Sequence, residues 1–311
     1  VGDPILRRWL AARILGSEPA VPEFAQGRPP YLDPDVWLTQ SSLAGSNGVP
    51  LPPLRADPPS NSLEILLPGS RIKIKTGDEQ KLFDKSWDDI EISLAVHRFS
   101  WLPLAGSNVD PGWVDAMWRA WSSRHGKEFN GWAWHPYTAA ERVINILDFG
   151  RRMGLPGDAA DTRRLLSAHG QIILRNLEYN GDHYTSNHLS NNGRGLFLLG
   201  LTLGIEAFAD IGGKILIEEA SRIFAPSGIL REGSSHYHLL LTRNYASAWL
   251  AAEAHGRPEA SPLKTISGTA LRAASAFSLS GGLPLIGDIS PDCPPEFLTC
   301  LLPNNDITAG W

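Results

Sequence analysis

The sequence predicts a mainly helical domain in which antiparallel helix hairpins form an α/α toroid. From about Asp110 to residue 280, apolar residues recur at the spacing of one helix face, in segments of similar length. The connections between these segments are short, and short connections make successive helices antiparallel neighbours. Hairpins of this kind curl into a toroid, and the loops at one end of the toroid frame a cleft.

The first 105 residues are predicted to pack on the toroid. Residues 4–16 predict a short amphipathic helix, and residues 17–60, rich in Pro, Gly, Ser and Asn, predict an extended arm. Residues 62–68 and 71–77 alternate in polarity and predict a strand pair with Pro68-Gly69 at the turn. Residues 281–311 are turn-rich and predict the start of a C-terminal β domain. The expected domains therefore span residues 1–105, 106–280 and 281–311.

Apolar stripes and end signals predict the helices of the toroid. Thr138 followed by Glu141 has the form of a capping box, in which the two side chains accept backbone N–H groups of the first turn. Gly193, Gly195 and Gly200 lie inside one helix and destabilise it by roughly 1 kcal/mol each relative to alanine, so we expect close packing there. The predicted helices span residues 112–125, 138 onward, 161–179, 187–203, 212–224, 237–254 and 261–279.

Charge and composition exclude several classes of function. The net charge of −5 leaves no basic surplus for holding a nucleic acid. No apolar run reaches the roughly 18 residues that cross a bilayer. The only cysteines, Cys293 and Cys300, make neither a disulfide framework nor a zinc site by themselves. An acidic substrate therefore needs a local groove lined by basic or amide side chains.

Tryptophan is unusually frequent, with 11 copies, and five of them crowd into residues 113–134. Flat aromatic faces line carbohydrate grooves, but aromatic side chains at helical spacing also pack helices together. We expect packing roles for most of the five and assign Trp134 to substrate binding.

Two loops concentrate polar side chains where helices begin. Such clustering predicts one site that is rimmed by both loops. The first loop holds Asp182, His183, Tyr184, Asn187, His188, Asn191 and Asn192, and the second holds Arg231, Glu232, His236, Tyr237, His238 and Arg243. Asn187 also fits the simpler role of a helix N-cap.

These side chains suit some chemistries better than others. No dense carboxylate cluster accompanies the histidines, and His236 and His238 are spaced to point in different directions on a helix, so we expect no metal and no cofactor. Hydrolysis of a glycosidic bond needs two facing carboxylates, for which Glu232 and Asp182 are available. Amide, imidazole and phenol groups are more abundant here than carboxylates, which favours a different reaction.

That reaction is β-elimination on a uronic acid. The enzyme neutralises the sugar carboxylate so that the C5 proton becomes acidic, removes this proton, and protonates the departing oxygen. Neutralisation needs hydrogen-bond donors where the enolate charge develops. Proton transfer needs a tyrosine or histidine whose pKa is lowered by a cationic neighbour. Asn187, His188 and Tyr237 supply these groups without a metal.

The motifs resemble a known family. FSWLPLAG, WHPYTAAERVINIL, NLEYNGDHYTSNHLSNNGRGLFLLG and GILREGSSHYHLLLTRNY look like the helical half of bacterial heparinase II/III-type and related alginate lyases, and GGLPLIGD looks like their entry into a β domain. The resemblance covers roughly residues 60–290. It implies an incomplete α/α toroid followed by an antiparallel β-sandwich, with an acidic polysaccharide bound between them.

Carried over by motif, Asn187 and His188 match the family's carboxylate-neutralising pair, and Tyr237 matches its base, acid or both. We expect His183, Tyr184, Glu232, His236, His238, Arg243 and Trp134 to contribute to substrate binding. Family members draw a further histidine or tyrosine, and some a structural zinc, from the β domain. The sequence ends at Trp311, so we expect a truncated β domain here.

The sequence therefore predicts a polysaccharide lyase, for which a periplasmic or secreted location is favoured over a cytoplasmic one. Two alternatives stay open at this point. One is a glycoside hydrolase on a similar toroid, with Glu232 and Asp182 as its carboxylates. The other is a protein that binds an exopolysaccharide without cleaving it.

Overall fold

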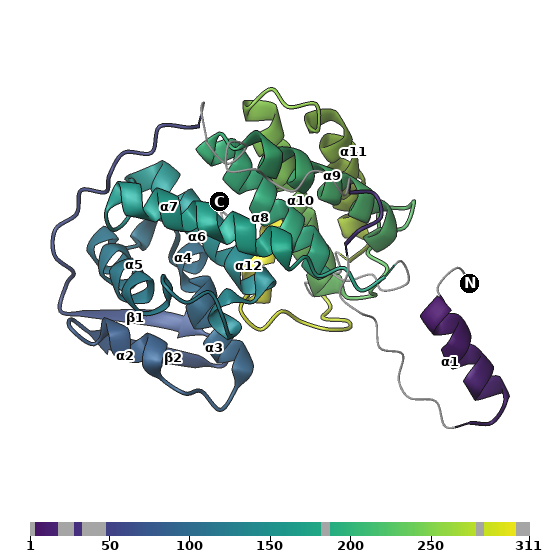
Figure 1. Ribbon diagram of the computed structural model, residues 1–311, viewed down its shortest axis with the longest axis horizontal. Helices are drawn as coiled ribbons and strands as arrows, with labels where there is room; N and C mark the ends of the chain where they lie inside the picture. Colours follow the sequence, from purple (N-terminus) through teal and green to yellow (C-terminus); the bar gives the residue numbers. More distant parts are fainter. Residues whose placement is uncertain (1–3, 18–27, 33–47, 182–186, 278–282, 303–311) are drawn as a thin grey trace.

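The computed structural model describes residues 4–17, 28–32, 48–181, 187–277 and 283–302. These residues are mainly helical and contain one two-stranded sheet. The helices from α5 to α11 follow one another across the body as an open series of hairpins, with α8 at its centre (Figure 1). The predicted class, a helical toroid that does not close, is confirmed.

The N-terminal elements agree with their sequence signals. Helix α1 spans Pro4–Ile14 and stands apart from the body (Figure 1). Strands β1 (Ser62–Leu67) and β2 (Ser70–Lys75) form the expected antiparallel pair, and Gly69 takes the turn with a φ of 63°. Three short helices follow: α2 (Glu79–Asp84), α3 (Ile90–Arg98) and α4 (Trp101–Ala105).

The described part of the predicted arm, residues 48–60, lies across the helical body. The N–H of Val49 donates to the carbonyl of Thr202 at 2.9 Å, and the N–H of Leu54 donates to the carbonyl of Leu155, also at 2.9 Å. The arm therefore contacts both the end of α8, at Thr202, and the connection between α6 and α7, at Leu155.

The main helices lie close to their predicted positions. They are α5 (Pro111–His125), α6 (Pro136–Met153), α7 (Ala159–Arg175), α8 (Asn187–Leu203), α9 (Glu206–Ile223), α10 (Ser235–Ala254) and α11 (Ala260–Ala274). The largest error is at α9, which begins six residues before the predicted position 212.

The predicted capping box at α6 is wrong. The helix begins at Pro136, whose missing N–H and fixed φ suit the first helical position. Thr138 is consequently already inside the helix, fully buried, and its hydroxyl has no hydrogen-bond partner among the described residues. Glu141 does not cap the helix and lies 3.4 Å from Arg194 on α8. The position of Pro136 therefore determines where the helix begins, and the spacing of Thr138 and Glu141 does not.

The tryptophan cluster is the core of the α5–α7 region. Trp121 and Trp134 enclose the buried guanidinium of Arg142, whose Cζ lies 3.9 Å and 5.2 Å from the two ring centroids. Trp134 is 3% exposed and its Nε1 donates to the carbonyl of His125, as in a packing role, and its assignment to substrate binding stays a prediction. Trp132, in contrast, is 56% exposed.

Glycines let α8 approach its neighbours closely, as expected. A Cβ at Gly195 would lie 2.7 Å from the Cβ of Ala140 on α6, and one at Gly193 would lie 2.6 Å from Ile215 on α9. A Cβ at Gly200 would lie 2.3 Å from the backbone nitrogen of Ala209, also on α9. Helix α8 is therefore held between α6 and α9 at distances that only glycine permits.

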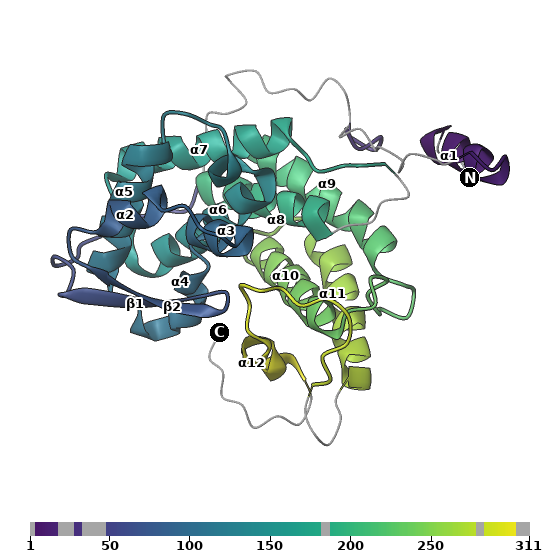
Figure 2. The ribbon, with the colours of Figure 1, turned by 90° about the horizontal axis from the view of Figure 1, so that it is seen from below.

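Residues 283–302 differ from the expected start of a β domain. Among these residues the structure has no strand; it has the short helix α12 (Pro295–Leu298), and the segment packs against α10 (Figure 2). Leu298 and Leu302 join Leu239 and Leu240 of α10 in one apolar cluster. Cys293 and Cys300 are free thiols. The described part of this turn-rich segment therefore packs its apolar side chains against α10 and forms no strand.

No helix in the described ranges combines the length and the apolar character needed to cross a membrane.

We expect Gly200→Ala to lower the free energy of unfolding by about 1–3 kcal/mol, because the added methyl group meets the α9 backbone. Urea denaturation measures this change. Gly268→Ala in α11 is the matched control: its Cβ would lie 3.6 Å from the nearest side-chain atom, so the helix should gain about 0.5–1 kcal/mol. Equal stabilities of the two variants would contradict the close-packing argument.

Candidate active site

The structure brings the start of α8 and the start of α10 to the same face of the molecule. Tyr137, in the first turn of α6, lies between them: its ring centroid is 4.7 Å from that of His188, and its phenol interacts electrostatically with Tyr237. Glu232, just before α10, interacts electrostatically with His188. Residues that are about fifty positions apart in the sequence therefore share one site.

A buried carboxylate holds His188. Nδ1 of His188 lies 2.7 Å from Oε1 of Glu178, and Nδ2 of Asn192 donates to Oε2 of Glu178 at 3.0 Å. Nε2 of His135 lies 3.6 Å from the same Oε1 atom. Since a carboxylate only accepts, His188 carries a proton on Nδ1, and Nε2 is the ring nitrogen directed away from Glu178.

The electrostatic surroundings keep Glu178 ionised at neutral pH. Burial by itself would raise the pKa of its carboxyl, but the hydrogen bonds from His188 and Asn192 and the electrostatic interaction with His188 outweigh burial and lower this pKa below its ordinary value. Burial lowers the pKa of His135, so its imidazole is neutral at pH 7. The exposed Trp132 ring lies 5.6 Å from this imidazole.

Asn187 opens helix α8 and is 9% exposed. Its Oδ1 is buried and has no hydrogen-bond partner in the part of the chain that the structure describes. Within the same described part, the amide of Asn191, one turn further along α8, has no partner at either Oδ1 or Nδ2. An unsatisfied buried polar group costs about 1–3 kcal/mol, and such groups are typical of binding sites.

Tyr237 is half-buried in the first turn of α10, where Ser234 caps the helix by accepting its backbone N–H at 2.9 Å. Burial and the carboxylates of Asp288, Glu232 and Asp292 raise the pKa of Tyr237 to about 12. A cationic neighbour was expected to lower this pKa, but the charged neighbours of Tyr237 named here are carboxylates, which raise it. The phenol of the free protein is protonated at neutral pH.

The two histidines beside Tyr237 bind backbone groups. Nε2 of His236 lies 2.9 Å from the carbonyl of Cys293, and its Nδ1 accepts the N–H of Ser290 at 3.3 Å. Nε2 of His238 lies 3.0 Å from the carbonyl of Ala270, and its Nδ1 accepts the N–H of Leu230 at 3.2 Å. Both rings are fully buried, and their predicted contact with substrate stays a prediction.

Of the other predicted residues, Glu232 lies at the site and Arg243 packs against the C-terminal segment. The Arg243 guanidinium lies 4.9 Å from the Phe297 ring centroid, and burial, together with Arg194, lowers its pKa to about 10. His183, Tyr184 and Asp182 lie outside the described residues. Their predicted roles stay predictions.

The sequence did not single out several residues at the site: His135, Tyr137, Glu178, Asp288, Ser290 and Asp292. One signal for them was present, because His135 and Tyr137 belong to the WHPY motif and flank the proline that starts α6. Glu178 and Asp288 also lie within quoted motifs, NLEYN and GGLPLIGD, whereas Ser290 and Asp292 lack such a signal. Within the described ranges, no group of three or more His, Cys, Asp or Glu side chains could hold a metal ion.

Glu178→Gln tests the buried carboxylate. Because the folded-state pKa of Glu178 is lowered, its ionised form stabilises the fold above the unfolded-state pKa, and this contribution is lost as the pH falls through the folded-state value. We expect the variant to be less stable by about 1.5–3 kcal/mol at pH 6, with a gap that narrows toward pH 3. Urea denaturation across this range measures the gap. The exposed Glu128→Gln should change stability by less than about 0.5 kcal/mol throughout, and a pH-independent gap for Glu178→Gln would refute the assignment.

Comparisons with known proteins complete this description. No family model matches the chain, and no curated protein matches it. Three similar solved structures are heparinase III (14% identity, TM-score 0.49, 89% of this chain and 46% of that one), heparan sulfate lyase HepC from Pedobacter heparinus (14%, 0.47, 91% and 48%) and a gene product titled heparinase III (17%, 0.46, 89% and 47%). The chain spans about half the length of these structures.

Proposed function

We propose that this protein is a polysaccharide lyase that cleaves a uronic-acid-containing polysaccharide by β-elimination. The observation that carries the proposal is the convergence of one amide, two imidazoles and two phenols at the starts of three helices: Asn187, His135, His188, Tyr137 and Tyr237. The motif resemblance supports the same reaction class.

The reaction breaks the C5–H bond and the C4–O bond of the uronate and forms a C4–C5 double bond. The C5 proton goes to a base, and the departing oxygen takes a proton from an acid. Both transfers become feasible only when the negative charge that develops on the carboxylate is stabilised by donors already in place.

Four of these residues have a role in this scheme. The Asn187 amide binds the sugar carboxylate together with His188 in its doubly protonated form, in which Nδ1–H donates to Glu178 and Nε2–H donates to the sugar carboxylate. Tyr237 is protonated in the free protein, so we assign it the transfer of a proton to the departing oxygen. His135 has a neutral imidazole and is our candidate for removing the C5 proton.

The charges of the site favour one orientation of an acidic sugar. Glu232 and Asp288 lie on the Tyr237 side, where they would repel a carboxylate. Asn187, His188 and His135 lie on the other side and offer an amide and imidazoles. The sugar carboxylate would therefore face the start of α8, and an uncharged edge of the sugar would face the start of α10. The exposed Trp132 ring would then pack against a neighbouring sugar ring. A periplasmic or secreted location is part of this proposal.

Tyr237→Phe should abolish elimination and leave binding nearly unchanged, since it removes only the transferred proton. The measurement is the ultraviolet absorbance of the conjugated product in a screen of heparan sulfate, hyaluronan, alginate and bacterial exopolysaccharides. Turnover near wild type in the variant would remove Tyr237 from the mechanism.

The same screen separates the alternatives. New reducing ends without ultraviolet absorbance would indicate a glycoside hydrolase. Measurable affinity without any product would indicate a binding protein.

Asn187→Ala should lower kcat by about 10²–10³-fold, by analogy with the loss of one oxyanion donor. Asn187→Ser is the matched control, because serine is also a good N-cap residue but lacks the amide. If Asn187 binds the carboxylate, both variants are slow. If serine restores the wild-type rate, Asn187 is a helix cap and the proposed role fails.

A further inference from the structure

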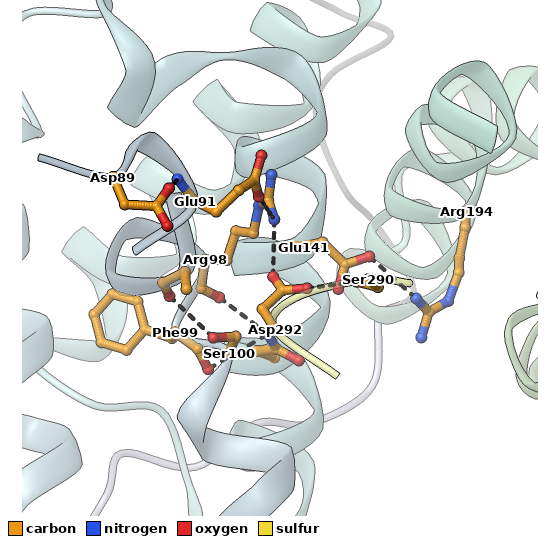
Figure 3. A network of polar contacts seen from close by, with 11 residues as sticks. Asp89, Glu91, Arg98, Phe99, Ser100, Glu141, Arg194, Ser290 and Asp292 are labelled. Carbon is orange, nitrogen blue, oxygen red and sulfur yellow. Dashed lines mark hydrogen bonds and ion pairs between the residues drawn. The ribbon is translucent and has the colours of Figure 1, made fainter. Parts of the chain in front are cut away.

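The C-terminal segment supplies a chain of polar contacts that reaches Tyr237. The Tyr237 phenol interacts with the Ser290 side chain, and Oγ of Ser290 donates to Oδ1 of Asp292 at 2.8 Å. Oδ2 of Asp292 accepts from Nη1 of Arg98 at 2.8 Å, and Glu91 lies 3.5 Å from the same nitrogen. Figure 3 shows Ser290, Asp292 and Arg98 in this order.

The first residues of α10 fix this segment in place. Oγ of Ser234 donates to the carbonyl of Asp288 at 2.6 Å, and Oγ of Ser235 donates to the carbonyl of Pro284 at 2.6 Å. His236 holds Ser290 and Cys293 through its two ring nitrogens. Ser290 is 6% exposed and Arg98 is 7% exposed, so the chain of contacts is largely shielded from solvent.

The direction of the hydrogen bonds defines what the chain of contacts can do. Asp292 is a pure acceptor, so the Ser290 hydroxyl points its proton at Asp292 and leaves the Oγ lone pairs free to accept from the intact phenol. When the phenol loses its proton, the Ser290 hydroxyl can turn from Asp292 to the new phenolate. Arg98 still balances the charge of Asp292 after this turn.

We propose that Ser290, Asp292 and Arg98 are positioning residues for proton transfer by Tyr237: Asp292 adds to the carboxylates that keep the phenol protonated, and the Ser290 hydroxyl stabilises the phenolate once the proton has left. The catalytic part of this proposal rests on the proposed function. In that reaction the O–H bond of Tyr237 breaks as the O–H bond of the departing oxygen forms. The phenol is restored from solvent after the C5 proton has left the base.

Several other groups face Tyr237 and set the background for a pH test. They are Asp288 on the C-terminal segment, Glu232 before α10, Tyr137 on α6 and the neutral ring of His236, whose centroid lies 5.9 Å from that of Tyr237. All of them stay unchanged in the variants below, so a difference between variants reports on Ser290 and Asp292 alone.

The test compares Asp292→Asn with Ser290→Ala. The first substitution keeps an acceptor for Arg98 but removes the negative charge, so the pKa of Tyr237 should fall, by up to about half a unit. The second substitution removes a hydroxyl that stabilises the phenolate and keeps every charge, so this pKa should not fall. Nuclear magnetic resonance of ¹³Cζ-labelled tyrosine measures both values, and Tyr237→Phe identifies the signal among the 6 tyrosines.

If the substitutions merely loosened the segment, both variants would lower the pKa of Tyr237. That result would overturn the proposal. An unchanged titration in Asp292→Asn would overturn it as well. Thermal unfolding checks that each variant is folded, and Ser290→Thr, which keeps the hydroxyl, should titrate like wild type. These readouts need no activity, so they stand even if the proposed function fails.

If the lyase activity is present, Ser290→Ala should lower kcat at least about tenfold with a nearly unchanged KM, and Ser290→Thr should recover most of the rate. A lower rate with no recovery by threonine would assign Ser290 to packing and contradict its role in proton transfer.

Discussion

The close packing of α8 is the constraint on which the site depends. Three glycines allow this helix to approach α6 and α9 at backbone distance, and the helix is buried along nearly its whole length. Its first residues are Asn187 and His188, so their positions follow from contacts made by Gly193, Gly195 and Gly200 further along the helix. A side chain at those positions would displace the helix and, with it, the polar groups at its start.

Around this fixed helix the polar groups separate by charge. The α8 side offers an amide and imidazoles, one of which is held by the buried carboxylate of Glu178. The α10 side offers a phenol among carboxylates, which keep it protonated. Two chemically different sides within one site are what an elimination requires, because the reaction stabilises a negative charge at one position and delivers a proton at another.

Much of the fold could be predicted from the sequence, and rather less of the site. Helical periodicity and short connections were sufficient for α5 to α11, because each helix carries apolar residues at helical spacing and most of the connections are short. Trp134, His236 and His238 were assigned to substrate because their residue types suit sugar binding, yet all three are enclosed. Type alone does not tell whether a polar ring bonds to substrate or to a backbone carbonyl. Glu178 and Ser290 were missed because their roles arise from contacts distant in the sequence.

The ion pair between Arg98 and Asp292 joins residues 194 positions apart. Contacts of such large sequence separation form slowly, because a long loop must close before they can be made. The helical hairpins, which rest on local contacts, can assemble earlier. The phenol of Tyr237 therefore acquires its final surroundings at a late stage of folding, and an intermediate that already has native helix content would still lack a finished active site.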